Sequence, residues 1–121
     1  MANAKETMPK LLEIEGCLGA CLVDSNSGMM LASTPSSAVN LEIAAAGNTE
    51  VVRSKRKTMK ALGLLDAIED ILITLGKQYH LIRPLATNDA MFMYVVLDRN
   101  RSNLAMARLQ LREIEKGMTI L

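Results

Sequence analysis

Apolar and polar positions along the chain change their spacing in a way that predicts three helices and five strands. A short helix is expected to begin near Thr7, with Pro9 in its first turn. Residues 17–23 are apolar on both alternating sides, which is typical of a strand in the middle of a covered sheet. The polar residues 24–28 predict a turn, and residues 29–33 a return strand that completes a hairpin.

A long helix is expected from about 40 to 62, with Asn40 as its N-cap and Gly63 as its stop, and its side chains form three stripes at 100° per residue. The stripe expected to face the core comprises Leu41, Ala44, Ala45, Val52, Met59 and Leu62. A second stripe, nearly all small, comprises Ile43, Gly47, Val51, Ser54, Thr58 and Ala61. The third stripe is basic, includes Thr49 and is expected to face solvent. Because a surface helix needs only one apolar stripe, the second predicts another backbone close by.

Three further strands are predicted, at about 68–75, 78–85 and 90–98. The last is apolar on both sides and is expected to be central, whereas the first contains two acidic residues and is expected to be an edge. A closing helix is predicted over 102–118, and Met106 and Leu109 lie outside its core stripe. The order α-β-β-α-β-β-β-α predicts an α/β (α+β) fold, with a five-stranded antiparallel sheet sandwiched between helices.

Composition indicates a single domain that spans residues 1–121. Half of the 121 residues are hydrophobic and the formal net charge is +1, which excludes an intrinsically disordered chain. No apolar run is long enough to span a membrane, so no membrane insertion is expected. The first twelve residues lack the apolar core of a secretory signal, and we therefore expect a cytoplasmic protein.

Residues able to carry catalysis are few and are not grouped along the chain. Cys17 and Cys21 are interpreted as small buried hydrophobes, because two cysteines make neither a zinc site nor a disulfide framework. His80, the only histidine, has no serine or cysteine placed to partner it, so we interpret it as structural. Glu69 and Asp70 are adjacent on a predicted strand and point to opposite faces. No catalytic residue, cofactor or metal site is predicted, and the chain is expected not to be an enzyme.

The strongest electrostatic feature is a basic cluster on the long helix, which comprises Arg53, Lys55, Arg56, Lys57 and Lys60. Such a cluster is either a solvated helix face or a contact to an acidic protein partner or to phosphates. A nucleic-acid surface usually adds exposed aromatic residues or a larger basic excess, and the sequence has neither. A protein partner is therefore favoured, and nucleic-acid binding is the weaker alternative.

The order of elements and several segments resemble the Roadblock/dynein light chain family. The first segment is the apolar strand and glycine-closed turn at 16–28. The later segments, which look like the single-domain bacterial branch, are 68–71, 78–85, 92–98 and 103–108. The resemblance covers nearly the whole chain, from about residue 8 to 118.

The resemblance implies an α/β/α sandwich of the Roadblock (profilin-like) type that forms a homodimer through its long helices and edge strands. The small stripe and the edge strand would then meet a second copy, and the expected interface comprises Ile43, Gly47, Val51, Ser54, Thr58, Ala61, Ile71 and Ile73. Family members are non-catalytic platforms, and several bind or regulate Ras-like small GTPases, some by activating GTP hydrolysis. Residues considered for a partner contact are Arg53, Arg56, Lys57, Lys60, Met106 and Leu109.

Two other functions stay open at this point. Related sandwich folds bind small molecules between sheet and helix, and a sensing domain of this kind would have a cavity with polar anchors such as Tyr79, His80 and Tyr94. A generic adaptor without a GTPase partner is the other alternative. The leading hypothesis is a homodimeric module that scaffolds or regulates a small GTPase in signalling or motility.

Overall fold

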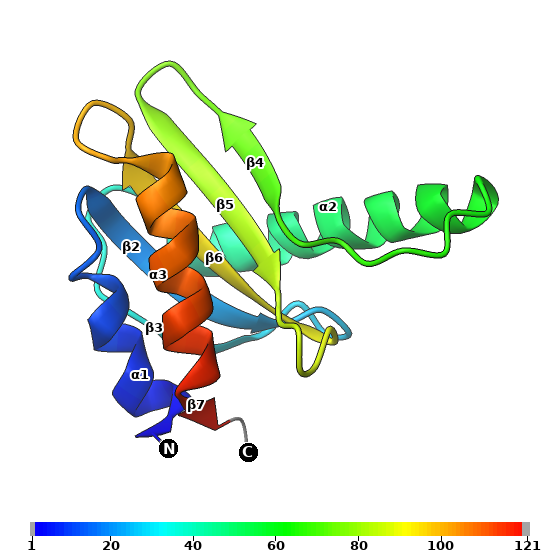
Figure 1. The fold of residues 1–121 in the computed structure, drawn as a ribbon, viewed down its shortest axis with the longest axis horizontal. Coiled ribbons are helices and arrows are strands. Elements are labelled where there is room, and N and C mark those ends of the chain that lie inside the picture. Colours follow the sequence, from blue (N-terminus) through cyan, green and yellow to red (C-terminus); the bar gives the residue numbers. More distant parts are fainter. Residues whose placement is uncertain (1, 120–121) are drawn as a thin grey trace.

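A computed structural model describes residues 2–119, and within that range it contains three helices and seven strands (Figure 1). The helices are α1 (Ala4–Leu11), α2 (Leu41–Ala61) and α3 (Leu104–Lys116). The strands are β1 (Ala2–Asn3), β2 (Cys17–Asp24), β3 (Met30–Ser33), β4 (Ile71–Thr74), β5 (Gln78–Pro84), β6 (Met91–Asp98) and β7 (Met118–Thr119).

The main sheet has five strands in the order β3-β2-β6-β5-β4, and all neighbouring strands are antiparallel. The strand predicted to be central, β6, lies in the middle of the sheet, and β2 lies beside it. The strand predicted to be an edge, β4, pairs only with β5. Pro84 pairs with Phe92 at the end of the β5–β6 ladder, where its missing N–H leaves no gap among central hydrogen bonds. The predicted five-stranded sheet is confirmed.

Helices cover both faces of this sheet, with α1 and α3 on one face and α2 on the other (Figure 1). Alternating residues of the central strands pack against the helices on opposite faces of the sheet, because successive side chains of a strand point to opposite faces. Leu22 and Met93 pack toward α1 and α3, whereas Val23 and Phe92 pack toward α2. Two hydrophobic cores, one on each side of the sheet, therefore hold the fold together.

The first and last elements differ from their predicted forms. The helix α1 begins at Ala4 rather than near Thr7, because the Asn3 side chain caps it by accepting a hydrogen bond from the backbone N–H of Glu6 at 2.9 Å. Pro9 consequently lies near the end of the helix, not in its first turn. The parallel pair of β1 and β7 was not predicted, since strands of two residues carry no periodic pattern.

The starts of α3 and β4 also differ from their predicted positions. The helix α3 begins at Leu104 rather than at residue 102, because its N-cap is Asn103, whose side chain accepts from the backbone N–H of Met106 at 3.0 Å. The edge strand β4 begins at Ile71 instead of residue 68. Residues 62–70 form an irregular segment that runs back along α2 before β4 begins (Figure 1).

The long helix α2 packs on the sheet through its first half only. Leu41, Ala45 and Val52 are buried as predicted, but Leu62 is exposed and Met59 is only half-buried. Thr49, predicted to face solvent, is buried, and its hydroxyl donates to the carbonyl oxygen of Ala45 at 2.7 Å. The helical prediction was right, but the end of α2 extends past the β4 edge of the sheet and has nothing to pack on (Figure 1).

Candidate interaction surface on α2 and β4

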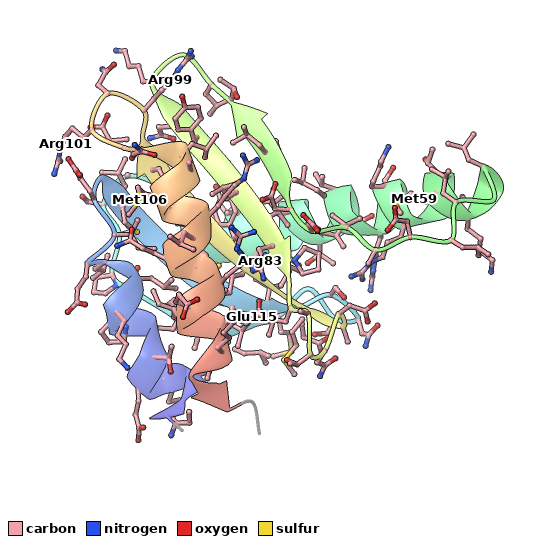
Figure 2. The ribbon with its side chains drawn as sticks, viewed as in Figure 1. Met59, Arg83, Arg99, Arg101, Met106 and Glu115 are labelled. Atoms are coloured by element: carbon pink, nitrogen blue, oxygen red, sulfur yellow. The ribbon has the colours of Figure 1, made fainter. Side chains whose placement is uncertain are left out.

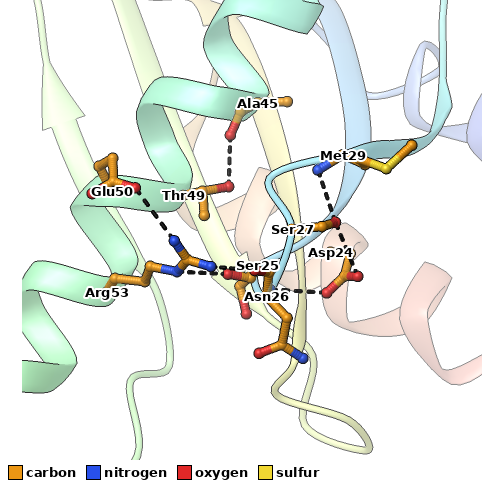
Figure 3. A network of polar contacts seen from close by, with 9 residues as sticks. All are labelled: Asp24, Ser25, Asn26, Ser27, Met29, Ala45, Thr49, Glu50 and Arg53. Atoms are coloured by element: carbon orange, nitrogen blue, oxygen red, sulfur yellow. Dashed lines mark hydrogen bonds and ion pairs between the residues drawn. The ribbon is translucent and has the colours of Figure 1, made fainter.

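Two arginines of the basic cluster tie α2 to the body of the domain, and Figure 3 shows the contacts of one of them, Arg53. The Arg53 Nε donates to the carbonyl oxygen of Ser25 at 2.9 Å, and its Nη2 donates to the carbonyl oxygen of Asn26. The Arg56 Nη2 donates to the carbonyl oxygen of Asp89 at 2.5 Å. Both side chains thus satisfy backbone carbonyls of the loops at one end of the sheet, a role that the basic pattern alone did not indicate.

The loop that receives Arg53 is held in shape by its own polar residues. The Asp24 carboxylate accepts hydrogen bonds from the backbone N–H of Asn26 at 2.9 Å and from the hydroxyl of Ser27 at 3.1 Å (Figure 3). Gly28 closes the turn with a φ of +77°, a conformation that side chains disfavour. The predicted turn at 24–28 therefore presents its carbonyl oxygens to α2 in a fixed geometry.

The stripe of small residues on α2 faces away from the sheet. Ile43 is 71% exposed, Ser54, Thr58 and Ala61 are exposed, and Val51 is half-buried. A Cβ built at Gly47 would meet no other element within 4 Å among the described residues. The second backbone that the stripe predicts is thus not supplied by the part of this chain that the structure describes.

Past the sheet, the end of α2 and the segment that follows it form a projection, which we call the arm (residues 54–70). Its helical part carries Lys55, Lys57 and Lys60 in exposed positions. Beyond the helix, Leu62 and Leu64 are exposed, and Leu65 is not shielded by any part of the described chain. The arm returns to the body where the Arg108 side chain of α3 makes two hydrogen bonds to the Asp70 carboxylate, at 2.8 and 3.0 Å.

Next to the arm, part of the sheet is left uncovered on the α2 side. Arg53 lies on the side of α2 that contacts the 24–28 turn, while Asn48, on another side, lies near Tyr94 of the sheet. Further toward the edge, Ile71 and Ile73 of β4 and His80 of β5 remain half-buried although they face the α2 layer. We call the set of Val51, Ile71, Ile73 and His80 the open face.

A chain of polar contacts crosses the open face. The Tyr94 hydroxyl lies 2.9 Å from His80 Nδ1, and His80 Nε2 lies 2.8 Å from the Gln78 side-chain oxygen. Burial raises the pKa of Tyr94 to about 12, although the hydrogen bond from Asn48 works against this rise. Burial also lowers the pKa of His80. Since the Gln78 oxygen can only accept, His80 carries its proton on Nε2, and Nδ1 accepts from Tyr94. No pattern in the sequence indicated this contact.

A groove of about 820 Å³ lies between the arm and the loop after β5. Met59 and Leu64 of the arm line one side, Pro84 and Leu85 line the other, and Arg112 of α3 reaches it. Figure 2 shows Met59 on the arm, with Arg83 nearer the body of the domain. For a ligand-sensing domain, the cavity was expected between the sheet and a helix. The groove lies outside these layers.

The remaining predicted residues are not brought together. Met106 and Leu109 are 50% and 46% exposed on α3, which covers the opposite face of the sheet from α2, the helix that carries Lys57 and Lys60 (Figure 1). Cys21 is buried and free, and burial raises the pKa of its thiol to about 12, which keeps it in the unreactive thiol form. Cys17 is half-buried rather than buried, also free, and its pKa is raised by burial.

Two absences concern only the part of the chain that the structure describes. Among residues 2–119 no three histidine, cysteine or acidic side chains are grouped closely enough to hold a metal ion. Within the same range, no helix has the length and apolar character needed to span a membrane.

Neither a family model nor a curated protein matches the sequence. Solved structures do match the fold. A Roadblock/LC7 domain from Streptomyces avermitilis superposes with a TM-score of 0.81 at 12% identity, and the match covers 96% of this chain and 94% of that one. Myxococcus xanthus MglB gives a TM-score of 0.79 at 15% identity, covering 93% of this chain and 88% of that one. The gliding protein MglB from Thermus thermophilus gives 0.67 at 16% identity, covering 93% and 87%. The chain therefore has the Roadblock/LC7 fold.

Proposed function

We propose that this chain is a non-catalytic, homodimeric interaction module of the cytoplasm that scaffolds or regulates a Ras-like small GTPase in signalling or motility. The observation that carries the proposal is the arm, which passes the β4 edge while the open face beside that edge stays uncovered (Figure 1). The shared fold with a gliding protein adds support, as does the family resemblance of the sequence.

The arm needs a partner for physical reasons. Its helical part, residues 54–61, continues α2 past the sheet without a buried residue, so it lacks the packing that supplies most of the stability of a helix in a protein. Leu62, Leu64 and Leu65 add exposed apolar surface at its end, which is costly in water. A neighbouring molecule that covers the arm would stabilise both the helix and these leucines.

A second copy of the chain fits this requirement. In a two-fold dimer each subunit offers the same surface, so two copies that meet at their β4 edges would each lay an arm over the open face of the other. Small residues such as Ser54 and Thr58 permit a close approach of the two backbones. The proposed interface comprises Ile43, Gly47, Val51, Ser54, Thr58, Ala61, Ile71 and Ile73.

The GTPase would bind to the assembled pair and act through contacts only. A rigid surface that fits one state of the GTPase switch segments better than the other shifts their equilibrium toward that state. Lys57 and Lys60 are exposed and suited to an acidic partner, whereas Arg53 and Arg56 are already engaged with loop carbonyls. The full set of proposed contact residues is Arg53, Arg56, Lys57, Lys60, Met106 and Leu109.

The dimer is tested by analytical ultracentrifugation of the wild type and two matched variants. Thr58→Arg places a large charge on the proposed interface, and because Thr58 is exposed and its hydroxyl bonds to its own helix, the fold should survive. Ala105→Arg makes the same kind of change on exposed α3. We expect the wild type and Ala105→Arg to sediment as dimers and Thr58→Arg as a monomer with unchanged circular dichroism. A monomeric wild type would overturn the proposed dimer.

The GTPase partner is tested by pull-down with purified Ras-like GTPases of the same genome, loaded with GDP or with a non-hydrolysable GTP analogue. We expect retention that depends on the nucleotide and that weakens in the double variant Lys57→Glu/Lys60→Glu. If no GTPase is retained in either state, the module is a generic adaptor and the GTPase part of the proposal fails.

The groove beside the arm favours one other candidate, a small-molecule sensor, because its volume of about 820 Å³ is in the range of ligand sites. A thermal-shift screen against a metabolite library separates the two functions, since a ligand that binds only the folded form raises the melting temperature. We expect no metabolite to raise the melting temperature in a saturable way. A saturable rise in the melting temperature that is lost in Leu64→Arg would favour the sensor.

A further inference from the structure

We propose that His80 makes the assembly of two copies depend on pH, so that the dimer weakens as the solution becomes acidic. This inference rests on the dimer proposed above and adds a means of regulating it. It starts from the position of His80 on the open face, in register with Ile73 on the edge strand. In the separate chain this side chain is half-buried, and an arm laid over it would remove its remaining contact with water.

The groups around His80 favour its neutral form. In β6, Tyr94 donates its hydroxyl proton to Nδ1, and the two rings meet edge to face with their centroids 5.5 Å apart. In β5, Gln78 accepts from Nε2. The neighbouring strand β4 contributes the apolar Ile73, and α2 contributes the uncharged Asn48 through Tyr94. A further titratable group, Cys21, acts on Tyr94.

Protonation of His80 would reverse part of this arrangement. A proton on Nδ1 turns that nitrogen from an acceptor into a donor, so the Tyr94 hydroxyl would have to point its own proton elsewhere and accept instead of donating. Among the described residues no carboxylate forms an ion pair with His80, and nothing there compensates the new charge. The helical part of the arm carries Lys55, Arg56, Lys57 and Lys60 and no acidic residue, so this part would repel a charged His80 beneath it. The acidic residues of the arm, Asp66, Glu69 and Asp70, follow the helix, and Asp70 is paired with Arg108.

The direction of the effect follows from proton linkage. Burial lowers the pKa of His80 in the folded chain, and further burial in the dimer would lower it again. The separated chains then bind more protons than the dimer, so acid favours separation. The contribution of His80 is fully present above its pKa in the separate chain, which burial places below the ordinary histidine value of about 6.5, and it is lost as the pH falls through that pKa.

The test measures the dimer dissociation constant by sedimentation equilibrium at pH 7.5 and pH 5.5, for the wild type and for His80→Gln. His80 is the only histidine in the chain, so no other imidazole contributes in this window. We expect the constant of the wild type to rise by at least roughly fivefold at pH 5.5, within the tenfold per pH unit that each linked proton allows. The constant of His80→Gln should change less than twofold.

A second measurement keeps the proposal testable if His80→Gln folds poorly. The imidazole signals of the single histidine can be followed by NMR in the wild type and in monomeric Thr58→Arg, and we expect a lower His80 pKa in the wild type. This inference is overturned if the wild type has the same dimer dissociation constant at both pH values and the same His80 pKa as the monomeric variant. The proposed dimer would still stand. A chain that is monomeric at both pH values overturns the dimer and this inference together.

Discussion

At the scale of single residues, one buried ion pair stands out as a structural feature. The Arg83 Nε donates to the Glu115 carboxylate at 2.9 Å, and the other carboxylate oxygen accepts from the backbone N–H of Ala86 at 3.0 Å. The side chains of Arg83 and Glu115 are only 14% and 6% exposed, and they join β5 to α3 (Figure 2). Loss of one partner would leave the other charge buried without compensation.

We predict that Glu115→Ala lowers the free energy of unfolding by about 3–5 kcal/mol, because Arg83 then stays buried and unpaired. Urea denaturation followed by circular dichroism measures the change. The matched control is Glu113→Ala, on the same helix, whose ion pair with Lys116 is 62% and 74% exposed. The Glu113→Ala control should lower the free energy of unfolding by at most about 1 kcal/mol. Equal losses in the two variants would contradict the assigned role of the buried pair.

At the scale of secondary-structure elements, α2 is one helix in two environments. Its first half is held by apolar contacts and its second half by the bonds of Arg53 and Arg56 to the loops, whereas none of residues 54–61 is buried in the described chain. Gly47 lies near the middle of the helix on the side that faces solvent, so nothing around it requires a glycine in the separate chain. Gly19, on β2, is the opposite case: a Cβ there would come within 2.6 Å of the Ser36 side chain.

From this contrast we predict opposite signs for two identical substitutions. In the monomeric Thr58→Arg background, Gly47→Ala should raise the free energy of unfolding by about 0.5–1 kcal/mol, because alanine loses less backbone entropy in a helix and its Cβ meets no obstacle in the separate chain. Gly19→Ala should lower it, because the Ser36 side chain must move and its hydroxyl would lose a 2.8 Å bond to the carbonyl oxygen of Leu18. Thermal unfolding of the two variants in this background, at equal protein concentration, compares them. A destabilising Gly47→Ala in the monomeric background would contradict the open space beside this glycine.

At the scale of the whole molecule, the fold has a well-packed body and one projection. The two cores on either side of the sheet, together with the β1–β7 pair that joins the two ends of the chain, make the body self-contained. The arm is the exception, with its exposed lysines and leucines. A part of the chain with few buried contacts opens more easily than the rest.

We therefore predict that hydrogen exchange in the arm depends on assembly. In monomeric Thr58→Arg, backbone amides of residues 56–62 should exchange at least about tenfold faster than in the wild-type dimer, because the end of α2 then frays freely. Mass spectrometry of peptides after short labelling times measures this difference. Amides of β6, paired on both sides in the centre of the sheet, serve as the control and should not differ. Equal protection of the arm in both proteins would place it outside the interface.

Much of the fold follows from local features of the sequence. The apolar run of β6 predicted its central place, the Asn40 side chain caps α2 as expected by accepting from the Ile43 N–H at 3.1 Å, and the acidic residues before β4 predicted an edge. These features act within a few residues, so they can be recognised without the rest of the chain. Boundaries shifted where the deciding contact was a cap that the pattern did not favour, as at Asn3 and Asn103.

The candidate site was predicted less completely, because it depends on contacts between distant segments. The small stripe of α2 was recognised, but the burial of Thr49 and the bonds of Arg53 depend on loops beneath the helix that are distant from it along the chain. The contact between His80 and Tyr94 needs two strands in register, which no local pattern specifies.

The amino-acid sequence alone thus determined which segments are helices and strands and which faces of them are apolar, because these properties arise from neighbouring residues. Only the tertiary structure decided that α2 passes the edge of the sheet, that Glu115 is buried with Arg83, and that His80 lies on an uncovered face. The physical reason is that burial and pairing depend on how far each element extends over the others, and that distance is set by the packing of the whole chain.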